Sequence, residues 1–508
     1  MQNSWFIEAQ KFLTIKDQFK LGDLSTEKQN PDTIGLAQIS QTDLKLALET
    51  FHQVDRKALN AFMAKKEILL PLATTINDTL RDGDKVFFVG CGATGRLALS
   101  IEFLAHALQI EGHERVFGMM SGGDLALIHS IEKFEDYPEY AHRQLQDLNF
   151  AGNDLVIAVT EGGETPFVIG AAQYAVEHSK RKPFFMYCNP DAVLIKVAER
   201  SKLVLEDDRI HKINLDIGPM ALSGSTRLQA TTIQMLACSL ALFSSKQSTQ
   251  WESQVQQLID ILPSLTNDDF CELIEIESDI YHKGESVLYK VEPSLAIAVM
   301  TDTTERAPTF SLAAFENRQD QIQKWSWCYL YDEDSTTAEM AWEKLLLRTP
   351  RTLEWPELEG IAGAKRLYGF DFSHSLRDFR EKKLGFTQHL AVIEMTHQQL
   401  AMRLGRGKAV CDMTKLQLWQ RHLVLKMILN AHSTLVMGRL QRYQSNIMTY
   451  VKASNNKLID RATRYILLLL KEKGREDISY DEVVMKIYEV KSQIGPDRPI
   501  VLEVLKQF

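Results

Sequence analysis

A short hydrophobic run that leads directly into a glycine-rich turn constrains this chain more than any other feature. Residues 85–99 read KVFFVGCGATGRLAL, where the apolar run 86–89 is followed by the turn 90–96 and then by an apolar helical segment. The run predicts a buried parallel strand. The turn predicts a phosphate-binding loop, because glycines let backbone N–H groups approach an anion and the next helix directs its positive end toward it. Thr94 would add a hydroxyl donor.

The spacing of Gly90, Gly92 and Gly95 also fits the dinucleotide-binding fingerprint. That function requires an acidic residue about 20 positions further on, at the end of the second strand, to bind the ribose. Here the second strand, predicted at 114–120, ends in another glycine turn, and its acid, Asp124, comes late. A nicotinamide or flavin site and a purely structural turn remain alternatives. We favour a phosphorylated small molecule, bound without a cofactor.

The bulk properties limit the class of protein. At 508 residues the chain is too long for one hydrophobic core and predicts two or three domains. A net charge of −9 argues against a general nucleic-acid or anionic-membrane surface. The six cysteines are scattered without metal-ligand spacing, which indicates free thiols in a reducing compartment and no metal site. No apolar run reaches the roughly 18 residues of a membrane span, so we expect a cytoplasmic protein.

The order of elements along the chain predicts an α/β fold. Residues 1 to about 40 are polar and irregular, like an arm that lies over a neighbour, and 41–80 have helical spacing. Strands and helices then alternate, which indicates a parallel sheet covered on both faces, with ligands beyond the carboxyl ends of its strands. The predicted strands are 86–90, 115–120, 154–160, 183–189 and a short one near 202–205; the predicted helices are 97–107, 125–133 and 167–177.

Four polar loops fall at that edge of the sheet. They are the turn 90–96, the turn 121–124, the loop 160–166 (TEGGETP) and the loop 222–227 (LSGSTR). The second leads into a predicted helix that would carry Glu132 and Glu135 on one face. Structural explanations remain for each: a solvated helix face for the two glutamates, helix N-caps for the hydroxyls of 222–227, and a plain ion pair for Arg96.

These segments resemble a known family. GCGATGRLAL, MSGGDLALIHSIEKFED, VTEGGETPFVIGAAQYA, CNPDAVLIKVAER and LDIGPMALSGSTRLQATT resemble, in order, the sugar isomerase (SIS) domain of the branch that contains N-acetylmuramic acid 6-phosphate etherase and the glucokinase regulatory protein. The arm LSTEKQNPDTIGLAQIS is similar to the segment that precedes the domain in this branch. The resemblance extends roughly over residues 23–240.

The resemblance implies a ligand and the residues that bind it. The family binds phosphorylated sugars, here a fructose phosphate or an amino-sugar or muramic acid phosphate, with the phosphate in the hydroxyl-rich loops. Glu132 and Glu135 would face the sugar hydroxyls. The phosphate site would comprise Gly92, Ala93, Thr94, Thr160, Gly162, Ser225 and Thr226.

The second half is interpreted as a diverged SIS domain with an empty pocket. Its strand, loop and helix would fall at 285–301, but the loop 291–296 (VEPSLA) has no glycine, and Glu292 would repel an anion. The predicted architecture is therefore two SIS domains, each a parallel sheet flanked by helices in a flavodoxin-like three-layer sandwich, with a helical tail. The expected limits are 1–45 for the arm, 46–245 and 246–430 for the two domains, and 431–508 for a C-terminal lid.

The later helices resemble the tail of the glucokinase regulatory protein, most specifically in SNNKL at 454–458. There the matched lysine reaches the sugar phosphate of the first domain. The resemblance therefore makes Lys457 the residue that closes the first pocket from the other half. The alternative is a surface lysine beside a helix start.

The resemblance weakens at the catalytic residues. Etherase chemistry removes a proton next to a carbonyl carbon and expels lactate, which requires two carboxylates as base and acid. The second of the family's glutamates falls on Glu135, but the first falls on Leu104. Glu102 lies two residues earlier, about 200° around a helix, and should point elsewhere. The segment 302–310 (DTTERAPTF) resembles the etherase segment with the first glutamate, so Glu305 would serve only if the halves pack to aim it across.

We therefore expect a sugar-phosphate-binding protein with tandem SIS domains. The pattern fits a ligand-sensing regulator of the glucokinase-regulatory kind better than an enzyme: a ligand gripped by both halves would favour one orientation of them, which a protein partner could detect. A sugar kinase as partner is implied only by the resemblance. The alternative is an N-acetylmuramic acid 6-phosphate etherase or lyase, and the third possibility is a phosphosugar isomerase.

Overall fold

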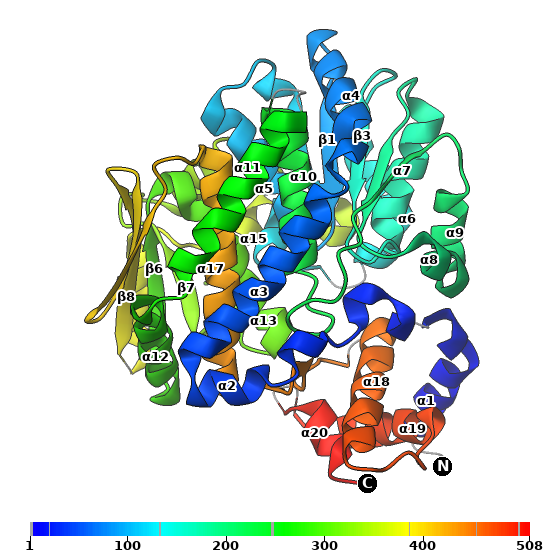
Figure 1. The fold of residues 1–508 in the computed structure, drawn as a ribbon, viewed down its shortest axis with the longest axis vertical. Helices are drawn as coiled ribbons and strands as arrows, with labels where there is room; N and C mark the ends of the chain where they lie inside the picture. The colour runs from blue at the N-terminus through cyan, green and yellow to red at the C-terminus, as the bar shows by residue number, and fades with distance from the viewer. Residues whose placement is uncertain are drawn as a thin grey trace.

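Two five-stranded sheets form the centres of the two halves of the molecule (Figure 1). The computed structural model describes residues 4–19, 21–131, 134–244, 248–385, 387–453, 455–495 and 498–508. Helices α5 and α10 of the first half contact α13 and α17 of the second, so the two halves meet through helices. These bounds are α5 Ala93–Leu108, α10 Gln229–Phe243, α13 Ala296–Phe310 and α17 Leu418–Arg439.

The first sheet is entirely parallel, which confirms the predicted α/β class. Its strand order is β2-β1-β3-β4-β5, and Val86 in β1 lies opposite Val116 in β2 and Leu155 in β3. Successive residues of a strand point to opposite faces, so Val86 and Phe88 join one hydrophobic core while Phe87 and Val89 join another. The strands are β1 Val86–Gly90, β2 Val116–Met120, β3 Leu155–Val159, β4 Phe184–Tyr187 and β5 His211–Asn214.

Helices cover both faces of this sheet, giving the expected three layers. The first core contains side chains of α3, α4, α5 and α10, and the second contains those of α6, α7, α8 and α9. The bounds not yet given are α3 Leu44–Met63, α4 Leu70–Arg81, α6 Pro138–Asp147, α7 Pro166–His178, α8 Asp191–Val197, α9 Glu199–Leu205 and α11 Ser248–Ile261.

Two predicted elements of the first half are wrong. The strand expected near 202–205 is the helix α9, whose buried residues Ser201 and Val204 are three positions apart, as on one helical face. The helix expected over 125–133 is a short 3-10 turn at Asp124–Leu127 and another at Phe134–Asp136. The Asp124 amide, just before this segment, donates to the carbonyl oxygen of Arg351 in the second half at 3.0 Å.

The second sheet is mixed rather than wholly parallel. Its order is β10-β9-β8-β6-β7, in which β6 is parallel to β7 and β8 while β9 and β10 are antiparallel. His397 and Gln398 join β8 to β9 with positive φ angles of 50° and 67°, as a tight hairpin requires. The bounds are β6 Ser286–Val291, β7 Cys328–Tyr331, β8 Gln388–Thr396, β9 Gln399–Leu404, β10 Gly407–Asp412, α12 Asp268–His282, α14 Ala338–Leu346, α15 Ala364–Tyr368 and α16 Ser375–Leu384.

The C-terminal helices and the first helix of the N-terminal arm pack together at the lower right of Figure 1. Helix α18 and helix α1 both contact α19, and short turns of the arm contact α18. The arm, expected to be irregular, includes the helices α1 and α2. The predicted domain limits stay proposals, and α17 passes through the one at residue 430. The bounds are α1 Ser4–Ile15, α2 Leu36–Thr42, α18 Asn456–Glu472, α19 Tyr480–Lys491, α20 Ile500–Leu505, β11 Tyr443–Gln444 and β12 Ile447–Met448.

Across the described ranges, no helix combines the length and apolar character that crossing a membrane would need. The six cysteines are free, as their scattered spacing predicted.

Candidate functional site

The glycine turn after β1 forms a tight loop at the N-terminus of α5. A Cβ on Gly90 would lie 2.3 Å from the carbonyl carbon of Thr94, so only glycine fits there. Gly92 has a φ angle of 56°, and the helix begins at Ala93, which leaves the N–H groups of its first turn facing the loop. The Thr94 hydroxyl donates to the Cys91 carbonyl oxygen at 2.9 Å. Thr94 thus closes the loop. Its hydroxyl hydrogen already forms this bond, so the hydroxyl is not free to donate to a phosphate as predicted.

The loop 222–227 presents a buried hydroxyl without a partner. Ser225 is 5% exposed, and its Oγ has no hydrogen-bond partner among the residues described. Ser223, by contrast, donates to the carbonyl oxygen of Glu27 at 2.7 Å. Thr226 is half-buried beside them. Leaving a buried hydroxyl without a hydrogen bond costs about 1–3 kcal/mol. Ser225 is therefore a candidate for a hydrogen bond to a ligand.

Ser225→Ala is therefore expected to weaken sugar-phosphate binding by about tenfold or more, the effect of losing a hydrogen bond to a charged group. The melting temperature of the free protein should stay the same or rise slightly, because no protein partner is lost. Titration calorimetry with N-acetylglucosamine 6-phosphate and a thermal melt measure the two quantities. Ser223→Ala is the matched control and should lower the melting temperature. Unchanged affinity in Ser225→Ala would remove this hydroxyl from the site.

The third loop, 160–166, is braced by the N-terminal arm. The carbonyl oxygen of Gly162 accepts from Nδ2 of Asn189 at 3.0 Å, and Oδ1 of Asn189 accepts from the amide of Thr26 at 3.1 Å. Within the loop the Thr160 hydroxyl lies 3.1 Å from that of Thr165. The arm thus holds the loop through Asn189, although the arm lies more than a hundred residues away in sequence.

Lys457 reaches this loop from the first turn of α18. Its Nζ lies 2.6 Å from Oε1 of Glu164, and Oε2 of the same carboxylate is 2.6 Å from Nη2 of Arg200. Burial alone would raise the pKa of Glu164, but the charges of Lys457 and Arg200 lower it to about 2. The structure therefore brings Lys457 to the first half, as the resemblance implied, and shows that a carboxylate already pairs with it.

Glu135 lies against the glycine turn, whereas Glu132 falls outside the described residues. Oε2 of Glu135 is 3.5 Å from Sγ of Cys91. Burial raises the pKa of the Cys91 thiol, and the neighbouring Glu135 carboxylate raises it further. Glu135 sits in the short 3-10 turn Phe134–Asp136.

Glu305 of the second half crosses to the first. Its Oε1 accepts from Nη1 of Arg96 at 2.5 Å, and Nε of Arg96 donates to the neighbouring Thr304 hydroxyl at 3.2 Å. Arg96 is the last residue of the glycine turn. Leu104 is buried in the core, and Glu102 points away to an ion pair with Arg348 at 2.9 Å, as its helical position predicted. The halves thus pack in the way that Glu305 needs in order to serve the first pocket.

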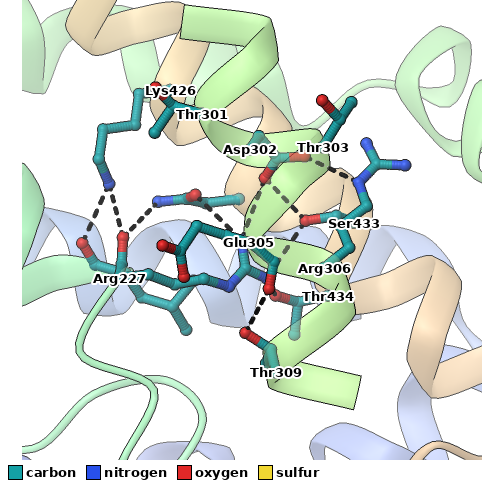
Figure 2. Close-up of polar contacts among 12 residues, drawn as sticks. Arg227, Thr301, Asp302, Thr303, Glu305, Arg306, Thr309, Lys426, Ser433 and Thr434 are labelled. Carbon is teal, nitrogen blue, oxygen red and sulfur yellow. Dashed lines mark hydrogen bonds and ion pairs between the residues drawn. The ribbon is translucent and has the colours of Figure 1, made fainter. Parts of the chain in front are cut away.

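A small cavity with charged residues in its wall lies beside this contact, between the two halves. Figure 2 shows Asp302 and Glu305 on α13 facing Arg227, with Lys426 approaching from α17. Burial, together with the charge of Arg227, lowers the pKa of Lys426 to about 7. Its Nζ donates to the carbonyl oxygen of Arg227 at 2.7 Å. The cavity is lined by Ala93, Leu97, Ser100, Arg227, Thr231, Met235, Ala298, Thr301, Asp302, Glu305, His422, Lys426 and Asn430.

Glu161 is a carboxyl group that the sequence interpretation missed. Burial raises its pKa, and the charge of Glu305 adds to the effect. The Thr231 hydroxyl lies 2.8 Å from the carbonyl oxygen of Thr226 and 3.0 Å from Oε1 of Glu161. The Thr231 hydroxyl thus joins Glu161 of the loop 160–166 to the carbonyl oxygen of Thr226 in the loop 222–227.

The corresponding loop of the second half is filled by its own carboxylate. Glu292 accepts from the Ser294 hydroxyl and from the amide of Met395, each at 2.7 Å. The predicted repulsion of an anion at this loop thus has a structural basis. Among the described residues, no three His, Cys, Asp or Glu side chains are grouped to hold a metal ion.

Comparison with known proteins places the chain. Residues 71–176 match the family described as glucokinase regulatory protein N-terminal SIS domain. An N-acetylmuramic acid 6-phosphate etherase of Trichodesmium erythraeum (strain IMS101) is 31% identical over 226 residues, which cover 44% of this chain and 69% of that protein. The chain belongs to this etherase branch of the SIS family. N-acetylmuramic acid 6-phosphate etherase 2 of Enterococcus faecalis (strain ATCC 700802 / V583), another member of the branch, is 28% identical over 301 residues, 58% of this chain and 95% of that protein.

Membership of the etherase branch confirms the resemblance on which the candidate residues were chosen. It does not by itself assign a role to any of them, and the positions of Gly92, Ala93, Thr160, Gly162, Thr226 and Lys457 in ligand binding remain predictions. Glu161, Glu164 and Arg227 lie in or next to the predicted loops. Their partners lie far away in the sequence, so no local pattern marked them.

Proposed function

We propose that this protein is a lyase of the N-acetylmuramic acid 6-phosphate etherase type. The observation that carries the proposal is Glu305, whose carboxylate pairs with Arg96 at 2.5 Å across the two halves. Glu305 would supply the second carboxylate, because the first half has Leu104 where the family has its first glutamate. The etherases of the same branch support this function over the ligand-sensing regulator that the sequence pattern favoured.

In this proposal the loops hold the phosphate group and leave the sugar facing the second half. The N–H groups at Gly92 and Ala93, the unpaired Ser225 hydroxyl and the ammonium group of Lys457 would bind the phosphate oxygens. Thr94 shapes the loop through its bonds to Cys91. The phosphate thereby fixes the sugar ring relative to the carboxyl groups.

The reaction needs one proton acceptor and one proton donor. A carboxylate removes the proton from C2, next to the carbonyl carbon, and the electron pair of the C–H bond forms a C2–C3 double bond. The bond between C3 and the lactyl oxygen breaks with its electrons, and that oxygen takes a proton from a carboxylic acid, so lactate leaves. We assign these two tasks to Glu305 of the second half and Glu135 of the first, which lies against Cys91 of the glycine turn.

The test is to incubate the purified protein with N-acetylmuramic acid 6-phosphate and measure lactate. We expect lactate from the phosphorylated sugar and none from N-acetylmuramic acid, because the phosphate provides the binding contacts. Glu135→Gln should abolish release. If no lactate appears while the protein binds the sugar phosphate, the lyase proposal fails. Formation of a ketose phosphate from an aldose phosphate would indicate the third possibility, an isomerase.

A ligand-sensing regulator is the second candidate. Helix α18 forms two ion pairs with the first half and the arm, Lys457 with Glu164 at 2.6 Å and Arg461 with Glu27 at 2.5 Å. A ligand that changes the partner of Lys457 would therefore shift the position of this helix. For this function fructose 6-phosphate should raise the melting temperature and free fructose should not. A protein partner such as a sugar kinase would then bind differently with and without the ligand.

A further inference from the structure

Glu164 places a buried negative charge over the loop 160–166, where the ligand's anion is proposed to bind. The residue is 4% exposed. Its side chain folds back over the loop, since a Cβ on Gly162 would lie 3.4 Å from both Cγ and Oε1 of Glu164. The carboxylate therefore lies against the backbone of this loop.

Both oxygens of this carboxylate bind cations. Oε1 pairs with Lys457 and Oε2 with Arg200, each at 2.6 Å. The side chains of Lys457 and Arg200 are each 34% exposed, whereas that of Glu164 is 5% exposed. The two cations thus face solvent on one side and the carboxylate on the other. An anion entering from solvent meets two cations that already share one carboxylate.

The backbone at Lys457 is fixed, so only its side chain has to move to exchange partners. Asn455 caps α18 by accepting from the amide of Leu458 at 2.9 Å. Glu27 of the arm holds the next turn of the helix through Arg461 at 2.5 Å and Arg464 at 3.3 Å. Glu135 also acts on the Lys457 charge from the glycine-turn side. Glu164 is the carboxylate in direct contact with Lys457 among the residues described.

We propose that Glu164 is a built-in anion that competes with the phosphate group of a sugar phosphate for Lys457. With the pocket empty, the carboxylate neutralises Lys457 and keeps it in place. With a ligand bound, Lys457 exchanges this carboxylate for phosphate oxygens, and Arg200 keeps Glu164 paired. The proposal rests on the proposed phosphate site but not on the lyase chemistry. Its consequence is that Glu164 lowers the affinity for phosphate esters.

Glu164→Gln tests this proposal, because it keeps the shape and a hydrogen-bond acceptor but removes the charge. Opposite and like charges this close interact by several kcal/mol at the dielectric constant of about 20 that suits protein sites. We therefore expect the Kd for N-acetylglucosamine 6-phosphate, measured by titration calorimetry, to fall by about tenfold or more. The Kd for the uncharged N-acetylglucosamine should not change. Weaker or unchanged binding of the phosphate ester would overturn the proposal and make Glu164 a residue that only positions Lys457.

Two further variants make the test specific. In a Lys457→Met background the additional Glu164→Gln change should have no effect on the Kd, because the ammonium group for which Glu164 and the phosphate compete is absent. Glu27→Gln is the matched control, an equally buried carboxylate on the same helix contact that does not touch Lys457, and it should not tighten binding. Tightening in the control or in the Lys457→Met background would contradict the proposal.

The outcome is separable from that of the proposed function. If Glu164→Gln fails to tighten binding while the wild-type protein releases lactate, only the competition is wrong. If neither protein binds the sugar phosphate, the phosphate site itself is wrong, and both proposals fall together.

Discussion

Glu305→Gln is expected to reduce lactate release from N-acetylmuramic acid 6-phosphate by about 100- to 10,000-fold, the usual contribution of one acid–base group. The amide cannot accept a proton from C2. It can still accept a hydrogen bond from Arg96, which donates to Oε1 of Glu305 at 2.5 Å in the wild type. The fold and the phosphate site should therefore persist, and the Kd for N-acetylglucosamine 6-phosphate should stay unchanged. Initial rates of lactate formation and titration calorimetry give the two readings.

Glu102→Gln is the control for this prediction. Glu102 is also a buried carboxylate that pairs with arginines of the second half, but it lies away from the pocket, on Arg348 and Arg351. We expect it to lower stability and leave the turnover number of the folded protein close to that of the wild type. A Glu305→Gln protein that retains most of the wild-type rate would show that Glu305 is only structural.

Arg306→Met is expected to lower the free energy of unfolding by about 3–5 kcal/mol, the effect of removing one partner of a buried ion pair. Arg306 is 1% exposed and binds Glu277 at 2.6 Å and Asp302 at 2.9 Å. Methionine would fill the space but leave two carboxylates buried without this cation. Urea unfolding followed by circular dichroism measures the change.

Arg377→Met provides the comparison, because Arg377 and Glu381 form an exposed pair one helical turn apart. Its loss should change the free energy of unfolding by no more than about 0.5 kcal/mol. Equal small effects of the two substitutions would mean that the ion pairs of Arg306 with Glu277 and Asp302 do not stabilise the fold.

The buried ion pairs also predict acid sensitivity. Burial raises the pKa values of Glu27 and Glu164, but their cations lower both to about 2, below the ordinary 4.5. A carboxyl group with a depressed pKa in the folded state stabilises the protein above its unfolded pKa, and this stabilisation is lost as the pH falls through the folded value. The free energy of unfolding should therefore decline between about pH 4.5 and pH 2. Glu164→Gln should make this decline shallower, and an unchanged slope would contradict the assigned pair.

Local sequence was sufficient to predict the first four strands of the first sheet. The run 86–89 forms β1, and the glycine turn after it needs Gly90 because the Thr94 carbonyl lies too close for any side chain. The predictions failed where distant contacts decide the structure. Segment 125–133 has helical spacing, but the amide of Asp124 bonds to Arg351 of the other half. The second sheet gained an antiparallel hairpin, β9 and β10, that a repeat of the first half does not predict.

The candidate site divides in the same way. Ser225 and the glycine loop follow from their own sequence patterns, and the resemblance pointed to Lys457. The contact of Glu305 with Arg96 required the packing of two segments more than two hundred residues apart, which no local pattern contains. The raised pKa of Glu161 depends first on its burial and also on the charge of Glu305, which lies far away in the sequence. The surroundings of such carboxyl groups can be described only when the folded structure is known.

The central claim is that one pocket is built by both halves, with the phosphate in the loops of the first and Glu305 from the second. A crystal structure of the protein with N-acetylglucosamine 6-phosphate tests it most directly. We predict the phosphate within hydrogen-bond distance of Ser225 and the glycine turn, and the Glu305 carboxylate about 3 Å from the C2 or C3 substituents of the sugar. A phosphate bound elsewhere, or a sugar that leaves Glu305 out of reach, would contradict the account.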